Sequence, residues 1–405
     1  MFCQNLLIWD RRMTNTRDIS LVTLQDVEEA IRLANEGVVQ RVSIEEINKK
    51  HGAIRDASRL QALVTIARNS KDKTLHLYGA GNLENSLESL CSYAPALTAI
   101  RLNTMIKLGG VSVSRRRALQ YAVDKMVNTD NQNYPMVVKG RVIDLCCISG
   151  ADRQYLSQLF STRDYTAVKN SSAMSKSLTD ILKFIAVDDF YKLDAELLRG
   201  FGVFTCELFK NTQEHARVDT NGMRLTSHVE GMIASFINLQ SFVLENDYDY
   251  NDRLTEYFSS ITADKSGMEK VKCIQLSFFD TGPGITGRAF GKKFYDGNRS
   301  DEKEALLTCL KKNFTSKNQS GAGNGYPTVL SQLQRIGGLI RIRTGRHCIF
   351  NCFKGNRFDN QSKIFKDNDL MNFDCWSQDN LELAVGTVVS ILVPLRNESG
   401  QSLLF

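Results

Sequence analysis

The stretch Glu207-Leu-Phe-Lys-Asn211 is followed along the chain by Asp280-Thr-Gly-Pro-Gly284 and then by Gly321-Ala-Gly-Asn-Gly325. The spacing of Glu207 and Asn211 places a carboxylate and an amide on one face of a helix. Asp280 ends an apolar run that predicts a strand, and the glycine-rich stretch precedes an apolar-periodic segment that predicts a helix. In this order, the three stretches supply groups that can hold a nucleotide together with a magnesium ion.

Each group has its own chemical use. A carboxylate such as Glu207 can orient or deprotonate a water molecule, and the amide oxygen of Asn211 is a hard ligand that suits magnesium. Asp280 can accept a hydrogen bond from an exocyclic amino group such as that of adenine. Gly282 and Gly284 permit a sharp turn and the close approach of a flat base. Taken singly, the stretches are also compatible with an ordinary helix face or turn.

The glycine-rich stretch exposes backbone amides just before a helix, where the helix dipole also favours phosphate. It matches neither of two common phosphate motifs. The P-loop needs a fixed glycine spacing followed by Lys and Ser or Thr, and Gly287-Arg-Ala-Phe-Gly291-Lys-Lys293 departs in both respects. The dinucleotide fingerprint reads G-x-G-x-x-G after a strand, whereas this stretch reads G-x-G-x-G after a polar loop.

The ordered stretches resemble the ATP-binding domain of the GHKL superfamily, which includes DNA gyrase B, the ninety-kilodalton heat-shock chaperones, sensor histidine kinases and mismatch-repair ATPases. Residues 207–216 resemble the N box of that family, and residues 280–285 resemble its first glycine box. Residues 314–326 resemble the lid and second glycine box, and residues 386–394 resemble the last strand. The resemblance covers residues 195–396.

This resemblance implies a Bergerat-type α/β sandwich, a mixed sheet with helices on one face, over residues 191–405. It implies that Glu207 is the catalytic base and that Asn211 binds Mg²⁺. The residues expected to contact ATP are Asn211, His215, Asp280, Gly282, Gly284, Lys317, Gly321, Gly323, Gly325 and Thr387.

Residues 1–190 form a second expected unit, an unassigned α/β or α+β domain. Its apolar spacing predicts a helix over 23–35, helical segments within 44–66 broken at Gly52, and strands over 75–78 and 142–148. The segment 43–55 also resembles a helix-turn-helix, but an ordinary helical hairpin gives the same pattern.

Within residues 191–405 the sequence predicts helices over 197–216, 252–262 and 327–336. It predicts strands over 231–242, 272–279, 339–343 and 386–395. The span between Asn211 and Asp280 is longer than in a compact kinase domain, and residues 247–268 are acidic and then polar. We expect them to form a surface insertion.

Composition narrows the class of protein. Apolar residues make up 42% of the chain and charged residues 24%, which is typical of a globular protein. Ten cysteines without a recognisable secretory leader indicate reduced thiols and a cytoplasmic protein, and no apolar run is long enough to span a membrane. The net charge of +6 does not require nucleic acid, which we do not expect as a partner.

The sequence therefore favours a slow magnesium-dependent ATPase whose lid closes on ATP and so regulates binding to an unidentified protein partner. Two alternatives remain open. One is a protein kinase of the histidine-kinase or anti-sigma kind that acts in trans, and the other is a nucleotide sensor that does not hydrolyse ATP. Dimerisation on ATP is also left open.

Overall fold

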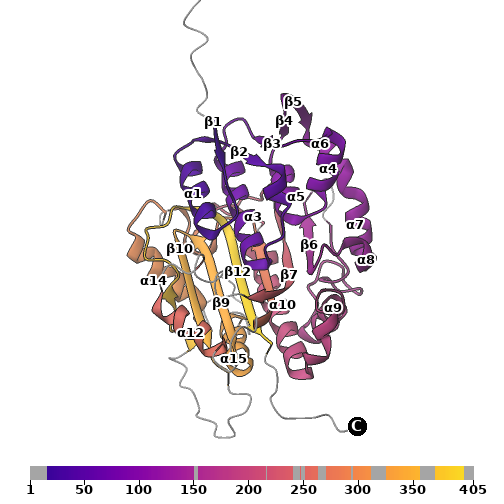
Figure 1. Cartoon of the computed structure of the whole chain (residues 1–405). Coiled ribbons are helices and arrows are strands. Elements are labelled where there is room, and N and C mark those ends of the chain that lie inside the picture. Colours follow the sequence, from indigo (N-terminus) through magenta and orange to yellow (C-terminus); the bar gives the residue numbers. More distant parts are fainter. Residues whose placement is uncertain are drawn as a thin grey trace, which may run out of the picture.

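Two β-sheets with helices packed around them make this chain an α/β protein, as expected (Figure 1). The computed structural model describes residues 16–149, 154–215, 217–239, 247, 251–262, 271–292, 295–311, 325–355 and 370–395. One sheet has five strands and comes from the N-terminal part of the chain, and the other has seven strands and begins with residue 142.

The five-stranded sheet is mainly parallel: β1 to β4 run in one direction, and β5 is antiparallel to β4. Thr23 starts the first helix with a capping box to Asp26, and Gly52, with φ of 100°, separates the next two helices. The elements of this part are β1 (Thr16–Ile19), α1 (Leu24–Asn35), β2 (Val39–Ser43), α2 (Ile44–Asn48), α3 (Ala53–Asn69), β3 (Thr74–Tyr78), α4 (Leu83–Cys91), α5 (Ala94–Leu102), β4 (Met105–Leu108) and β5 (Val111–Ser114).

The seven-stranded sheet has the order β11-β10-β9-β12-β8-β7-β6, and all its strand pairs are antiparallel. It therefore differs from the mixed sheet expected here, because the parallel pairs lie in the N-terminal sheet. Short hairpins such as β9–β10 impose antiparallel pairing, whereas parallel pairing needs a crossover. The strands are β6 (Val142–Ile148), β7 (Val229–Leu239), β8 (Val271–Asp280), β9 (Gly338–Gly345), β10 (His347–Phe353), β11 (Asp374–Cys375) and β12 (Ala384–Pro394).

Helices cover both faces of this sheet, although the sequence led us to expect them on one face. In β8, Ile274, Leu276 and Phe278 pack toward α9 (Ser171–Ile185), α10 (Ala195–His215) and α15 (Gly325–Ile336). Phe279 packs toward α3 on the opposite face, and Cys273 packs there against α12 (Asp252–Thr262). The alternation follows from the two-residue period of a strand.

The remaining helices are short or peripheral: α6 (Arg115–Ala118), η1 (Leu119–Ala122), α7 (Val123–Asp130), α8 (Tyr134–Val137), η2 (Val187–Lys192), α13 (Ile285–Phe290) and α14 (Arg299–Leu310).

The seven-stranded sheet extends across the expected domain boundary near residue 190. β6 and α9 both precede that residue, yet β6 pairs with β7 along its whole length and α9 packs on α10. Apolar side chains on both faces of β6 explain this placement, since Leu145 faces one core and Cys146 the other. The strand therefore needs covered faces on both sides of a sheet.

Helix α3 is buried between the two sheets. Ala57 and Leu60 are fully buried in the core that it shares with both sheets. A recognition helix must be exposed to enter a DNA groove. The helix-turn-helix interpretation of residues 43–55 is therefore wrong.

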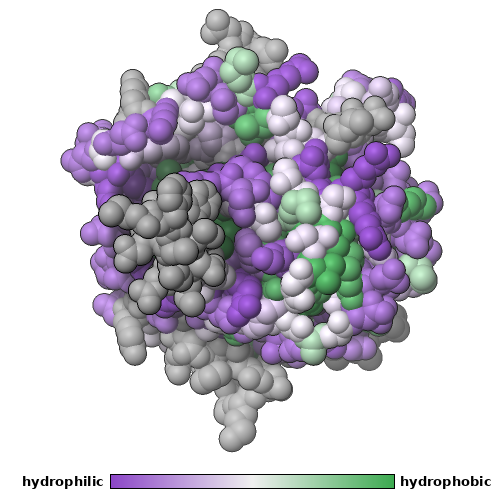
Figure 2. Space-filling model, turned by 90° about the horizontal axis from the view of Figure 1, so that it is seen from above, coloured by the Kyte–Doolittle hydropathy of each residue, from purple (hydrophilic) through white to green (hydrophobic). Residues whose placement is uncertain are grey.

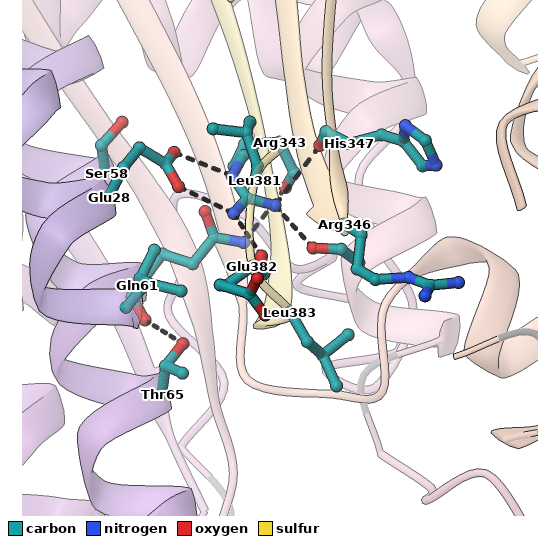
Figure 3. Close-up of polar contacts among 12 residues, drawn as sticks. Glu28, Ser58, Gln61, Thr65, Arg343, Arg346, His347, Leu381, Glu382 and Leu383 are labelled. Atoms are coloured by element: carbon teal, nitrogen blue, oxygen red, sulfur yellow. Dashed lines mark hydrogen bonds and ion pairs between the residues drawn. The ribbon is translucent and has the colours of Figure 1, made fainter. Parts of the chain in front are cut away.

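Polar contacts join α3 to the ends of the central strands β9 and β12 of the seven-stranded sheet (Figure 3). The side-chain amide of Gln61 donates to the carbonyl oxygen of Arg343 (3.1 Å) and to that of Gly386 (3.2 Å). The guanidinium of Arg343 forms a two-pronged ion pair with Glu28 of α1 at 2.8 and 2.9 Å. Thr65 accepts a hydrogen bond from the backbone N–H of Val385 at 3.0 Å. The N-terminal part is thereby fixed to the start of β12.

The end of the molecule at which β1 begins is mainly hydrophilic, with an apolar area to one side of the view (Figure 2). Of the helices in the described ranges, none is both long enough and apolar enough to cross a membrane.

Candidate functional site

Asp280 ends β8 on the face that packs toward α10. Its side chain is buried, and Oδ1 accepts a hydrogen bond from the backbone N–H of Gly282 at 2.9 Å. Burial raises the pKa of this carboxyl to about 7, although hydrogen bonds from Gly282 and Thr387 act in the opposite direction. The carboxylate thus lies in a poorly solvated corner where a hydrogen-bond donor would be favourable.

The start of β12 lies directly against this corner. Gly386 has φ of 81°, and its N–H donates to the carbonyl oxygen of Gly282 at 2.9 Å. A Cβ atom at Gly386 would lie 2.2 Å from the carbonyl oxygen of Asp280, so only glycine fits. The Thr387 hydroxyl that follows is 3.2 Å from that of Thr344 on β9. The segments expected to bind adenine are therefore adjacent.

The side chain of Tyr295 supports the turn that follows Asp280. The sequence did not predict this role. The Tyr295 hydroxyl donates to the carbonyl oxygen of Pro283 and accepts from the N–H of Gly287. A Cβ atom at Gly284, whose φ is 79°, would approach that hydroxyl to 2.8 Å. A tyrosine in a polar stretch gives no sequence signal for such a role.

Glu207 and Asn211 lie one turn apart on α10, as their spacing predicted, and both side chains are half-buried. Gly325 begins α15 beside them. A Cβ atom at Gly325 would be 3.3 Å from Glu207 Oε2 and 3.6 Å from Asn211 Nδ2. The fold thus brings the end of the glycine-rich stretch against the carboxylate–amide pair.

Tyr326 follows Gly325 at the start of α15 and packs against the core that α10 and α15 share with the sheet. Burial raises the pKa of the Tyr326 hydroxyl, and the negative charge of Asp280 raises it further. Helix α10 packs against both α15 and β8, and β8 pairs with β12. Residues from α10, α15, β8 and β12 therefore border one region.

Four of the expected ATP contacts remain without a structural account. Lys317, Gly321 and Gly323 lie outside the described residues. His215 is the last residue of α10, and its side chain also lies outside them.

Two arginines near this region were missed in the sequence. Arg217 follows α10, and Arg288 lies on α13, which begins directly after Gly284. Buried nitrogen atoms of both guanidinium groups have no hydrogen-bond partner among the described residues. The turn after Arg217 lies close to the end of α13, because a Cβ atom at Gly291 would lie 3.7 Å from the carbonyl oxygen of Thr220.

The donor set suits magnesium bound through a nucleotide better than a metal held by protein alone. Within the described ranges, no group of three or more His, Cys, Asp and Glu side chains could hold a metal ion. Magnesium commonly takes one or two protein ligands together with phosphate oxygens and waters. Asn211 fits that pattern, and the buried Asp280 fits an amino-group donor.

No protein-family model, curated protein or solved structure matches this chain.

Gly386→Ala and Gly222→Ala form a matched pair that tests the close approach of β12 to Asp280. Their φ angles are 81° and 80°, so alanine should cause similar backbone strain at both positions. A Cβ atom at Gly222 meets no atom within 4 Å, whereas one at Gly386 clashes with backbone. We expect Gly386→Ala to reduce the free energy of unfolding by at least ~2 kcal/mol more than Gly222→Ala in urea denaturation. Equal losses would contradict the tight packing of this corner.

Asp280 should make stability depend on pH. Because its pKa rises from 3.8 in the unfolded chain to about 7 in the folded one, the folded protein holds the proton more tightly between these values. The free energy of unfolding should therefore fall as the pH rises from about 4 to about 7, by at most roughly 4 kcal/mol.

Urea denaturation across this pH range checks the prediction. Asp280→Asn cannot titrate and should flatten the profile, whereas Asp124→Asn, at an exposed aspartate of α7, should leave it unchanged. A profile that keeps its slope in Asp280→Asn would show that another group causes it.

Proposed function

We propose that the chain binds ATP with magnesium in the region bordered by α10, α15, β8 and β12. The proximity of Gly325 to Glu207 and Asn211 carries the proposal most strongly, because it brings together two sequence motifs that resemble parts of one ATP site. The buried Asp280 carboxylate supports it from the other side, since an adenine amino group would supply the donor that this corner favours.

In this proposal Asn211 binds the magnesium ion, whose charge stabilises the phosphates, and Glu207 orients a water molecule for slow hydrolysis. Gly325, Lys317, Gly321 and Gly323 contribute phosphate contacts. Arg217 and Arg288 add positive charge. Buried nitrogen atoms of these two guanidinium groups have no protein acceptor among the described residues. Thr387 supports Asp280 through its hydroxyl.

Lid closure on ATP would then change the surface offered to a protein partner. α3 gives a physical route for this change, because Gln61 binds the carbonyl oxygen of Gly386 directly beside the adenine corner. Any movement of β12 on nucleotide binding would therefore reach the N-terminal part.

Calorimetry with ATP and Mg²⁺, together with phosphate-release assays, tests the assigned roles. Asp280→Asn should weaken ATP binding by about 10- to 100-fold, because it removes a charged acceptor from a buried hydrogen bond. Glu207→Gln should keep ATP affinity within a few-fold and reduce hydrolysis by roughly 100-fold or more. Asp124→Asn and Glu304→Gln, at exposed positions, should change neither quantity.

The outcomes separate the alternatives. ATP binding that survives Asp280→Asn unchanged would overturn the adenine assignment, and wild-type protein without affinity at millimolar ATP would overturn the proposal. Binding without phosphate release in any variant would favour the sensor, and transfer of the terminal phosphate to another protein would favour the kinase.

A further inference from the structure

Three arginines converge where α3, α5 and α6 meet the turn after β8. Arg68 donates to the carbonyl oxygens of Ser227 (2.6 Å) and Thr281 (3.4 Å). Arg101 donates through Nε to the carbonyl oxygen of Ser149 at 2.5 Å. Arg115 donates through Nη1 to the carbonyl oxygen of Arg101 at 3.4 Å. Within the part of the chain that the structure describes, each guanidinium uses one nitrogen atom for protein contacts, so further N–H groups remain for a ligand.

The three positive charges lie close together, and no carboxylate among the described residues pairs with them. Burial lowers the pKa of Arg101, and the charges of Arg115 and Arg68 lower it further, while no carboxylate contributes. Burial alone lowers the pKa of Arg68. Over the described residues, none of these three side chains forms an ion pair with Asp or Glu. Such an arrangement is costly unless an anion compensates it.

The contrast with another arginine-lined surface supports this reading. A cavity of about 510 Å³ beside β1 and α1 is lined by Arg17, Arg32 and Arg41. There Arg41 pairs with Asp18 at 2.6 Å, and Arg32 pairs with Glu29 at 2.7 Å. Those charges are already balanced by protein carboxylates.

We propose that Arg68, Arg101 and Arg115 form a binding site for a phosphate group, separate from the nucleotide region. Arg101 is only 6% exposed, which fixes its position, whereas Arg68 and Arg115 are half-buried and reach solvent. Guanidinium groups match the geometry and charge of phosphate oxygens. The phosphate is either free or carried on a side chain, since both present the same terminal oxygens. This proposal does not depend on ATP binding.

Inorganic phosphate is the first probe, with chloride at matched ionic strength as the reference. Phosphate should raise the melting temperature of the wild-type protein. Arg115→Gln and Arg68→Gln should each weaken phosphate binding at least about tenfold in calorimetry. Arg116→Gln and Arg117→Gln, exposed neighbours on the same helix, should change it less than about twofold. In chloride alone, Arg115→Gln should melt no earlier than wild type, because it relieves like-charge repulsion.

Further variants distinguish this site from the nucleotide region. Phosphate binding should persist in Asp280→Asn, and its loss there with retention in Arg115→Gln would place the anion at the nucleotide region and overturn the proposal. Equal weakening by Arg116→Gln, or no phosphate effect at all, would also overturn it. A phosphoserine peptide that binds tighter than inorganic phosphate would identify a phosphorylated side chain as the ligand, and equal binding would identify free phosphate.

Discussion

The burial of α3 between the two sheets is the constraint on which the rest of this structure depends. Its apolar residues, such as Leu60, close the core of the N-terminal sheet. Its polar residues, such as Gln61, satisfy carbonyl groups on the central strands β9 and β12 of the seven-stranded sheet. A buried polar group without a partner costs about 1–3 kcal/mol, so these contacts also fix the register of the helix against the sheet. The two sheets consequently share one helical layer.

Helix α3 packs on the face of the sheet opposite α10 and contacts the backbone that borders the proposed ATP region. Gln61 and Thr65 hold the backbone at Gly386 and Val385, just before the Thr387 hydroxyl. One turn later, Arg68 reaches the carbonyl oxygen of Thr281, which follows Asp280. Both segments of the proposed adenine-binding corner are therefore braced by one helix of the N-terminal part. If nucleotide binding changes the binding of a protein partner, α3 would connect the two regions directly, without a long chain of contacts.

Local features were predictable from the sequence, because they depend on neighbouring residues. The helix over 252–262 has the expected bounds, and the strand that ends at Asp280 lies where its apolar run predicted. The spacing of Glu207 and Asn211 likewise placed them on one helical face.

Features that depend on distant residues were not predictable in this way. We expected residues 247–268 to form a surface insertion. For the helix within them this prediction is wrong, because Leu254, Tyr257 and Phe258 are buried against the sheet. Acidic and polar residues surround them in the sequence, so the composition of the segment did not indicate a buried apolar face. The antiparallel order of the seven strands and the helices on its second face depend on pairings between distant segments. The arginine cluster likewise joins three helices, α3, α5 and α6, that lie in separate segments of the sequence.

A crystal structure of the full chain with Mg²⁺ and a non-hydrolysable ATP analogue tests the central claim most directly. The account predicts the adenine amino group in hydrogen-bond contact with Asp280 and the magnesium ion bound by Asn211. An analogue bound elsewhere, or bound with its base away from Asp280, would contradict the account.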